Sequence, residues 1–134
     1  MSTNGPILVT GAAGQLGAVG RTVTNLLLER GLPVRALVRR DDDRAAALRA
    51  AGAEVVVGDL LEPIDVHRAV SGSQRVYFGM SVSAGYLEAT TIMAAVAREV
   101  GVDALVKAIR GEKVESLIDS GAALVTKANI DQFK

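Results

Sequence analysis

Cysteine and tryptophan are absent from this 134-residue chain, histidine occurs once, at His67, and aromatic residues make up only 3%. Without cysteine the chain can form no disulfide, thiolate nucleophile or cysteine-ligated metal site. A single histidine likewise excludes the usual multi-histidine metal clusters, so we expect no metal. We expect His67 to lie on the surface of a helix. Any chemistry must come from glycines, hydroxyls, carboxylates and cations.

Net charge is also lacking, because 15 basic residues balance 15 acidic ones. Nucleic-acid and membrane-surface binders rely on a basic excess, so we expect neither partner. No apolar run reaches the roughly 20 residues of a membrane span, and no secretory signal pattern opens the chain. We therefore expect a soluble, cytoplasmic protein, and the length fits a single domain over residues 1–134.

Short apolar runs alternate with helical patterns along most of the chain. Strands are expected at residues 7–10, 34–38, 54–58 and 75–78, and helices at 14–30, 44–51, 63–70 and from about 85 to 100. The third strand is rich in β-branched residues and is expected to be buried on both faces. This alternation predicts a doubly wound, Rossmann-like α/β/α fold with a parallel sheet.

The last third of the chain permits two interpretations. In one, Gly101 ends the fourth helix and residues 104–106 form a fifth strand. In the other, residues 102–110 form a helix that ends at Gly111, since apolar residues recur at helical spacing with an acid early and bases late. We prefer the second, in which residues 122–126 supply the fifth strand of the parallel sheet. We also expect a short closing helix near residues 129–133.

A glycine-rich turn, Thr10-Gly11-Ala12-Ala13-Gly14-Gln15-Leu16-Gly17, lies between the first strand and the first helix. Gly11 permits a tight turn, Gly14 leaves room for a pyrophosphate, and Gly17 lets the helix pack closely on the sheet. Amide hydrogens at the start of that helix then face the phosphates. We expect a dinucleotide to contact Gly11, Ala13, Gly14, Gln15 and Leu16. The alternative is a turn that only closes the packing.

Two arginines, Arg39 and Arg40, follow the second strand. Domains that prefer NAD(H) usually place an acidic residue there to bind the ribose 2′-hydroxyl. Two guanidinium groups would instead pair with a 2′-phosphate, so we expect NADP(H), with NAD(H) binding more weakly. The alternative is a solvated basic pair that balances Asp41 to Asp43, and those aspartates could also hold an arginine away from the ligand.

Two further strand ends complete the candidate site. Asp59 and Leu60 follow the third strand, where Asp59 can reach the adenine amino group and Leu60 can pack on the ring. The alternative is that Asp59 merely starts a turn. Gly79 and Met80 follow the fourth strand and would border the ribose and nicotinamide.

Residues 5 to about 100 resemble the NmrA-like group of atypical short-chain dehydrogenase/reductases. The resemblance is carried by residues 9–17, Val34-Arg35-Ala36-Leu37-Val38-Arg39, Gly58-Asp59-Leu60 and Val76-Tyr77-Phe78-Gly79. It implies NADP(H) binding on this half; some members reduce quinones, and others sense the redox state of the cofactor. The Tyr-x-x-x-Lys pair of the reductase site has no match, so no catalytic residue is expected.

Residues 102–114 and 118–131 instead resemble the C-terminal end of periplasmic sugar-binding proteins of the ribose-binding type, where a helix precedes a strand. We therefore interpret the chain as an engineered chimera of two fragments, about 1–100 and 101–134, joined near residues 95 to 103. The alternative is a truncated natural reductase with a divergent tail. We expect a cofactor-binding domain without catalysis. The alternatives are a working NAD(P)H-dependent reductase and a folding scaffold without a ligand. An uncovered sheet edge would permit a homodimer.

Overall fold

The computed structural model describes residues 5–14 and 19–111. Strands and helices alternate throughout: β1 Ile7–Thr10, α1 Val19–Glu29, β2 Val34–Val38, α2 Asp43–Ala50, β3 Glu54–Val57, α3 Pro63–Val70, β4 Arg75–Tyr77 and α4 Tyr86–Ile109. The expected order of elements is confirmed. Their ends agree with the expected ones to within one residue, except at the start of α1 and the end of α4.

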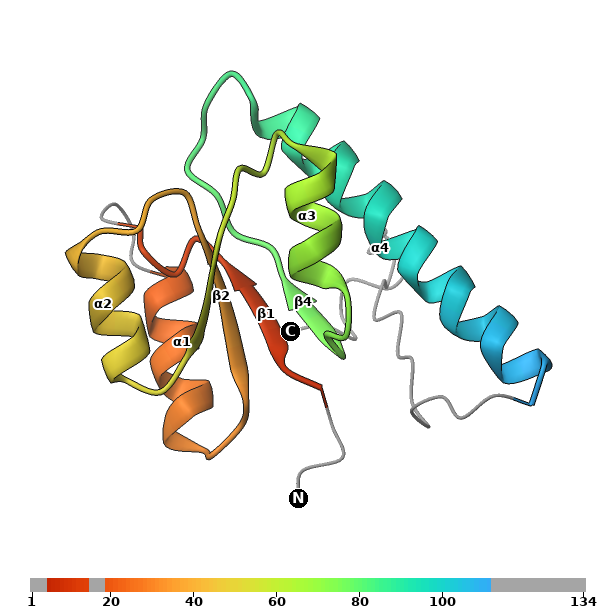
Figure 1. Cartoon of the computed structure of the whole chain (residues 1–134). Coiled ribbons are helices and arrows are strands. Elements are labelled where there is room, and N and C mark those ends of the chain that lie inside the picture. Colours follow the sequence, from red (N-terminus) through yellow and green to blue (C-terminus); the bar gives the residue numbers. More distant parts are fainter. Residues whose placement is uncertain (1–4, 15–18, 112–134) are drawn as a thin grey trace, which may run out of the picture.

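The described strands form one parallel sheet in the order β3-β2-β1-β4 (Figure 1). Val9 of β1 pairs with Ala36 of β2 on one side and with Tyr77 of β4 on the other. Leu8, Val9 and Ala36 are fully buried, because the central strands are covered on both faces. The predicted Rossmann-like parallel sheet is therefore confirmed for this part of the chain.

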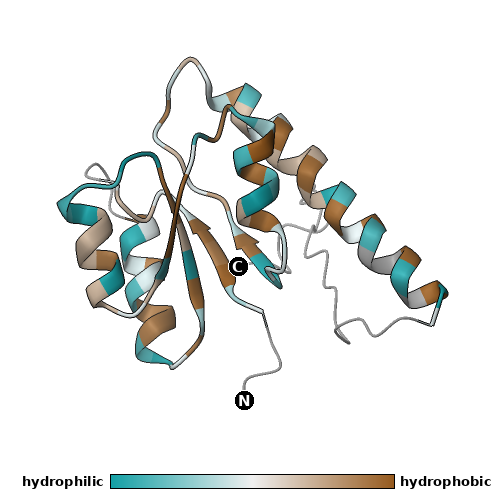
Figure 2. Cartoon of the chain, viewed as in Figure 1, coloured by the Kyte–Doolittle hydropathy of each residue, from teal (hydrophilic) through white to brown (hydrophobic). Residues whose placement is uncertain are grey.

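Helices cover the two faces of the sheet, with α1 and α2 on one side and α3 and α4 on the other (Figure 1). Neighbouring residues of β2 point to opposite faces, so Ala36 and Val38 join the core under α1 and α2 while Leu37 joins the core under α3 and α4. β1 and β2 are mostly apolar, although β2 also contains Arg35, whereas the helices carry many hydrophilic residues (Figure 2). This gives the expected three layers.

The prediction that β3 is buried on both faces is wrong. Glu54 and Val57 are exposed, and Val55 and Val56 are only half-buried. The reason is position in the sheet, since β3 lies at its edge and pairs only with β2 among the described strands. A run of β-branched residues indicates a pleated, packed strand but does not distinguish an edge from a centre.

The fourth helix does not end at Gly101, as one of the two interpretations had it, but continues to Ile109. Gly31 and Gly111 do end their helices with φ angles of 69° and 74°, whereas Gly101 keeps a negative φ. A glycine inside a helix costs about 1 kcal/mol relative to alanine, which favourable neighbours can offset. The alternative strand at 104–106 is therefore wrong, and the helical interpretation of 102–109 is confirmed.

The fifth strand expected at 122–126 and the helix expected at 129–133 lie outside the described residues, so the described sheet has four strands. In residues 5–14 and 19–111, none of the helices combines the length and the apolar character needed to cross a bilayer.

Candidate functional site

A cavity of about 480 Å³ opens at the carboxyl ends of the four strands. In doubly wound sheets, ligands bind in the crevice outside the carboxyl ends of the strands. Nine of the eleven predicted site residues line this cavity, while Gln15 and Leu16 lie outside the described residues. The nine are Gly11, Ala13, Gly14, Arg39, Arg40, Asp59, Leu60, Gly79 and Met80.

The turn after β1 is as tight as the sequence predicted. Gly11 has a φ of 72°, a conformation that residues with a Cβ rarely adopt. A Cβ at this position would also lie 2.7 Å from the carbonyl oxygen of Gly79. The amide of Gly14 donates to the Gly11 carbonyl at 3.1 Å, which closes the turn. The glycines therefore keep a backbone wall of the cavity free of side chains.

Close packing of the first helix on β1 involves a glycine that the sequence analysis overlooked. Gly14 is not helical, and the helical residues described in α1 begin at Val19. A Cβ on Gly20 would lie 2.5 Å from the Gly11 oxygen and 2.6 Å from the Gly11 carbonyl carbon. Gly17, to which this role was assigned, lies outside the described residues. The continued three-residue spacing from Gly11 through Gly14 and Gly17 to Gly20 could have revealed it.

Thr10 joins the glycine turn to the opposite wall of the cavity. Its side chain is fully buried, and its Oγ1 accepts a hydrogen bond from the Gly79 amide at 2.8 Å. The same hydroxyl lies 2.8 Å from the carbonyl oxygen of Gly79, to which it donates. This clamp fixes the start of the loop that carries Met80. Sequence reasoning included Thr10 in the motif but gave it no role.

Arg39 and Arg40 both line the cavity, and neither is held by the aspartates that follow them. Arg39 lies 3.4 Å from the Asp59 carboxylate, measured from Nη2 to Oδ2. Arg40 has no ion pair with the described part of the chain. Asp41 instead pairs with Arg49 at 2.7 Å, and this guanidinium lowers the pKa of Asp41. The alternative in which these aspartates sequester Arg39 or Arg40 is therefore not what the structure shows.

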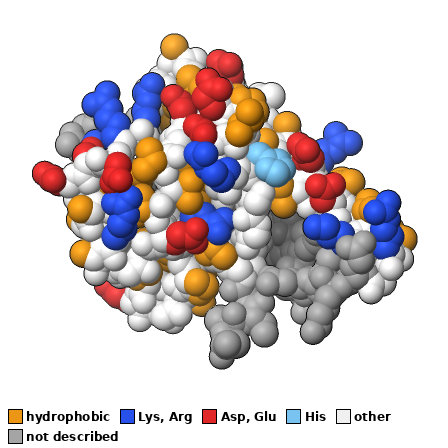
Figure 3. Space-filling model, in the orientation of Figure 1, with side chains coloured by type: hydrophobic (Ala, Val, Ile, Leu, Met, Phe, Trp, Pro, Cys, Tyr) orange, Lys and Arg blue, Asp and Glu red, His pale blue; other side chains and the backbone are white. Residues whose placement is uncertain are grey.

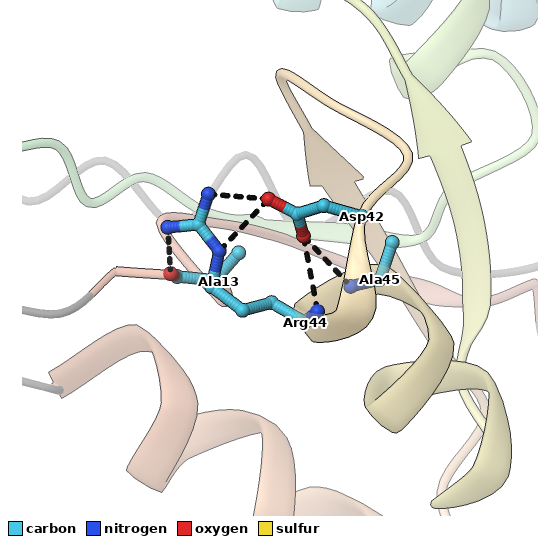
Figure 4. A network of polar contacts seen from close by, with 4 residues as sticks. All are labelled: Ala13, Asp42, Arg44 and Ala45. Atoms are coloured by element: carbon cyan, nitrogen blue, oxygen red, sulfur yellow. Dashed lines mark hydrogen bonds and ion pairs between the residues drawn. The ribbon is translucent and has the colours of Figure 1, made fainter.

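A third cation, Arg44, reaches the same cavity from the first turn of α2 (Figure 4). Asp42 caps this helix by accepting hydrogen bonds from the amides of Arg44 at 3.0 Å and Ala45 at 3.4 Å. The Arg44 guanidinium binds the Asp42 carboxylate, lowers its pKa, and extends one nitrogen to within 3.4 Å of the Ala13 carbonyl oxygen. Sequence reasoning treated Arg44 only as the start of a helix. Its position just after the short connection that follows β2, close in sequence to Arg39 and Arg40, could have indicated that it lies near the cavity.

Asp59 starts a turn, as one interpretation had it, and also lines the cavity, while its contact with adenine stays a prediction. Its Oδ1 accepts a hydrogen bond from the Leu61 amide at 2.9 Å, and its own amide donates to Asp65 at 2.9 Å. Arg68 holds the other Asp65 oxygen at 2.8 Å. A Cβ on Gly58 would press against the Asp65 side chain at 2.9 Å. The loop after β3 is thus fixed from both sides.

Basic and acidic side chains are interspersed on the face shown in Figure 3, and His67 is exposed on α3, as predicted. Within the described ranges no three metal-ligating side chains come together. The cavity at the strand ends therefore remains the candidate site.

A sequence profile described as NAD(P)H-binding matches residues 11–133. The chain belongs to the NAD(P)H-binding family. The profile crosses the junction expected between residues 95 and 103, so one family description covers both halves of this NAD(P)H-binding domain. The periplasmic resemblance of residues 102–134 and the origin of the chain as a chimera stay predictions.

Relatives of this NAD(P)H-binding domain are reductases and related proteins. It is 43% identical to sterol demethylase protein B of Methylococcus capsulatus over 70 residues. The aligned segment covers 52% of the chain and 20% of the relative. It is 41% identical over 71 residues to the NAD(P)H azoreductase of Xenophilus azovorans, covering 53% of the chain and 23% of the relative. The chain thus spans less than a quarter of these two curated relatives.

Among solved structures, triphenylmethane reductase of Citrobacter sp. complexed with NADP(H) matches with a TM-score of 0.57 and 29% identity, covering 71% of the chain and 34% of the reductase. The likeness extends over most of the described residues. Fold and family together establish an NAD(P)H-binding Rossmann-like domain related to NAD(P)H reductases.

Proposed function

We propose that this domain binds NADP(H) in the cavity at the strand ends and prefers it to NAD(H). The observation that carries the proposal is the composition of the cavity walls. One wall is the glycine turn, whose largest side chain at the cavity is the methyl group of Ala13, and the cavity is also lined by Arg39, Arg40 and Arg44. A backbone turn suits a diphosphate, and guanidinium groups suit a 2′-phosphate, to which they can bind in a bidentate manner.

The residues present fit this cofactor. Gly11 and Gly14 bring the backbone of the turn to the cavity without side chains, and at Gly11 a Cβ would also collide with the Gly79 carbonyl oxygen. When bound, the cofactor would supply a hydride, while the chain's own residues hold and orient it. The assignments are the turn residues Gly11, Ala13 and Gly14 for the diphosphate, Arg39 and Arg40 for the 2′-phosphate, Asp59 and Leu60 for adenine, and Gly79 and Met80 for the ribose and nicotinamide.

The binding proposal is tested by the thermal midpoint of the chain with and without NADPH. A ligand that binds only the native state stabilises it by about 2.7 kcal/mol at a hundredfold excess over its Kd. We expect a clear rise with NADPH and a smaller one with NADH at the same concentration. No rise at millimolar NADPH would instead favour a scaffold without a ligand.

A second proposed function is reduction of an acceptor by the bound cofactor. It is supported by the azoreductase and the triphenylmethane reductase among the relatives, and by Ser81 and Ser83, which line the cavity beyond Met80. Binding without catalysis stays our first proposal, because Tyr77 and Tyr86 are not followed by a lysine four residues later. Oxidation of NADPH in the presence of azo compounds, triphenylmethane dyes and quinones distinguishes the two.

Replacing Gly14 by valine tests the glycine turn directly. The φ of Gly14 is not positive, and its nearest contact for a Cβ is the Gly11 oxygen at 3.1 Å, so we expect only a small loss of stability. The branched side chain would occupy the space assigned to the diphosphate. We expect affinity for NADPH to fall at least about tenfold, equivalent to ~1.4 kcal/mol, by calorimetric titration. Parental affinity in Gly14→Val would contradict the assignment of the turn.

A further inference from the structure

We propose that Asp59 sets the discrimination between phosphorylated and unphosphorylated cofactors by acting through Arg39. The Asp59 carboxylate pairs with the Arg39 guanidinium, and a 2′-phosphate must take that guanidinium from it. This inference rests on the proposed binding of NADP(H). It makes Asp59 a positioning residue that opposes phosphate recognition, in addition to its assigned contact with adenine.

The backbone places these two side chains next to each other. Arg39 follows the last residue of β2 and Asp59 lies two residues beyond β3, and the ends of these strands pair at Val38 and Val57. The amide of Gly58 donates to the Val38 carbonyl at 2.9 Å, which continues the ladder past the strand ends. Arg39 Nη2 and Asp59 Oδ2 then lie 3.4 Å apart in the lining of one cavity.

The two partners are held unequally. The Asp59 side chain is 33% exposed and also accepts the Leu61 amide, while its backbone amide is bound by Asp65. The Arg39 side chain is 77% exposed, and within the described residues Asp59 is its single polar partner. A competing anion would therefore move the guanidinium and leave the carboxylate in place.

A 2′-phosphate is such a competitor. It carries more charge than a carboxylate and offers more acceptor oxygens to a guanidinium. Exposed ion pairs are weak, so the exchange is feasible but not free. A ligand without a 2′-phosphate leaves the pair intact. Asp59 should consequently reduce affinity for the phosphorylated ligand alone.

Arg40 and Arg44 do not provide the same adjustment. Arg44 is paired with Asp42, which also caps α2. Removing the Asp42 carboxylate would therefore disturb the helix as well as the charge. Arg40 has no carboxylate partner within the described residues. A phosphate that binds Arg40 would therefore not have to displace a carboxylate. The Arg39–Asp59 pair is the place where a carboxylate can be changed with little effect on a helix cap.

The test compares calorimetric Kd values for 2′,5′-ADP and 5′-AMP in the parent, Asp59→Asn, Arg39→Gln and the double variant. Both ligands carry adenine, so any lost adenine contact cancels in the ratio of their Kd values. We expect Asp59→Asn to raise the preference for 2′,5′-ADP by about two- to fivefold, the range of exposed ion pairs, when Arg39 is present. In the Arg39→Gln background, the preference should be low and insensitive to residue 59.

Two controls separate this effect from others. Glu62→Gln makes the same charge change at an exposed residue without an ion pair in the described part of the chain, and we expect it to leave the preference unchanged. Asparagine keeps an oxygen for the Leu61 amide, so Asp59→Asn should fold. If the thermal midpoint of Asp59→Asn falls below that of the parent, Asp59→Ser is used in its place, because serine also keeps an oxygen acceptor.

The outcomes are distinct. An unchanged or lower preference in Asp59→Asn, in a parent that prefers 2′,5′-ADP, overturns this inference and leaves the proposed function standing. A rise of the same size when Asp59→Asn is made in the parent and in the Arg39→Gln variant also overturns it, because general repulsion would then explain the effect. A parent that binds neither ligand overturns both proposals.

Discussion

The variant Gly20→Ala is expected to lose about 2 to 3 kcal/mol of unfolding free energy, in the range of overpacked core substitutions. The added methyl carbon would lie 2.5 Å and 2.6 Å from the carbonyl oxygen and carbon of Gly11, and 3.0 Å from the Thr10 oxygen. These are backbone atoms at the end of a buried strand, so no side chain can turn aside. The gain of about 1 kcal/mol from replacing glycine inside a helix is smaller than this cost.

Urea unfolding measures the effect, and Gly101→Ala is its matched control. Gly101 also lies inside a helix, but apart from that helix's own neighbouring backbone no atom of the described residues lies within 4 Å of the position of a Cβ. This variant is therefore expected to gain about 0.5 to 1 kcal/mol. Because the methyl group in Gly20→Ala pushes on Gly11, affinity for NADPH should fall as well. Parental stability in Gly20→Ala would refute the described contact between α1 and β1.

The variant Arg39→Asp is expected to weaken NADPH binding by about 30- to 100-fold while NADH binding changes only a few-fold. A hydrogen bond to a charged group contributes ~1.5–3 kcal/mol, and each 1.4 kcal/mol is tenfold in affinity. The new carboxylate would also stand beside Asp59 and repel a 2′-phosphate. A ligand that ends in a 2′-hydroxyl has no such charge to lose or to repel.

Calorimetric titration with both cofactors checks this result, with Arg75→Asp as the control. Arg75 is exposed at the start of β4, and the cavity lies at the carboxyl ends of the strands, at the other end of the sheet. The same charge reversal there should leave the ratio of the two affinities unchanged. Equal losses for NADPH and NADH in Arg39→Asp would contradict the assignment of the 2′-phosphate to this arginine.

Local signals in the sequence predicted most of the described elements because each depends on a few neighbouring residues. Pro63 occupies the first turn of α3, Asp42 caps α2, and Gly31 ends α1 with a positive φ. The strands β1 and β2 are short apolar runs between such signals. The carboxyl ends of parallel strands meet at one edge, so the sequence also indicated which residues gather there.

Other features could not be predicted because they depend on partners that are distant in the sequence. Whether β3 is central or at an edge depends on the strand order, and Val57 proved to be exposed. Whether Gly101 breaks a helix depends on its φ angle, which the residue type leaves open. Gly20 became a site of close approach only because the end of β1 lies against it.

By itself, the sequence determined the alternation of strands and helices and the glycine turn, because turns, caps and periodicity act over a few residues. It also determined that two arginines follow β2. Only the tertiary structure decided the ionic partners of these cations, pairing Arg39 with Asp59 and bringing Arg44 to the glycine turn. The physical reason is that charged side chains on long, flexible stems choose among several neighbours, and folding of the chain decides which of those neighbours lie within reach.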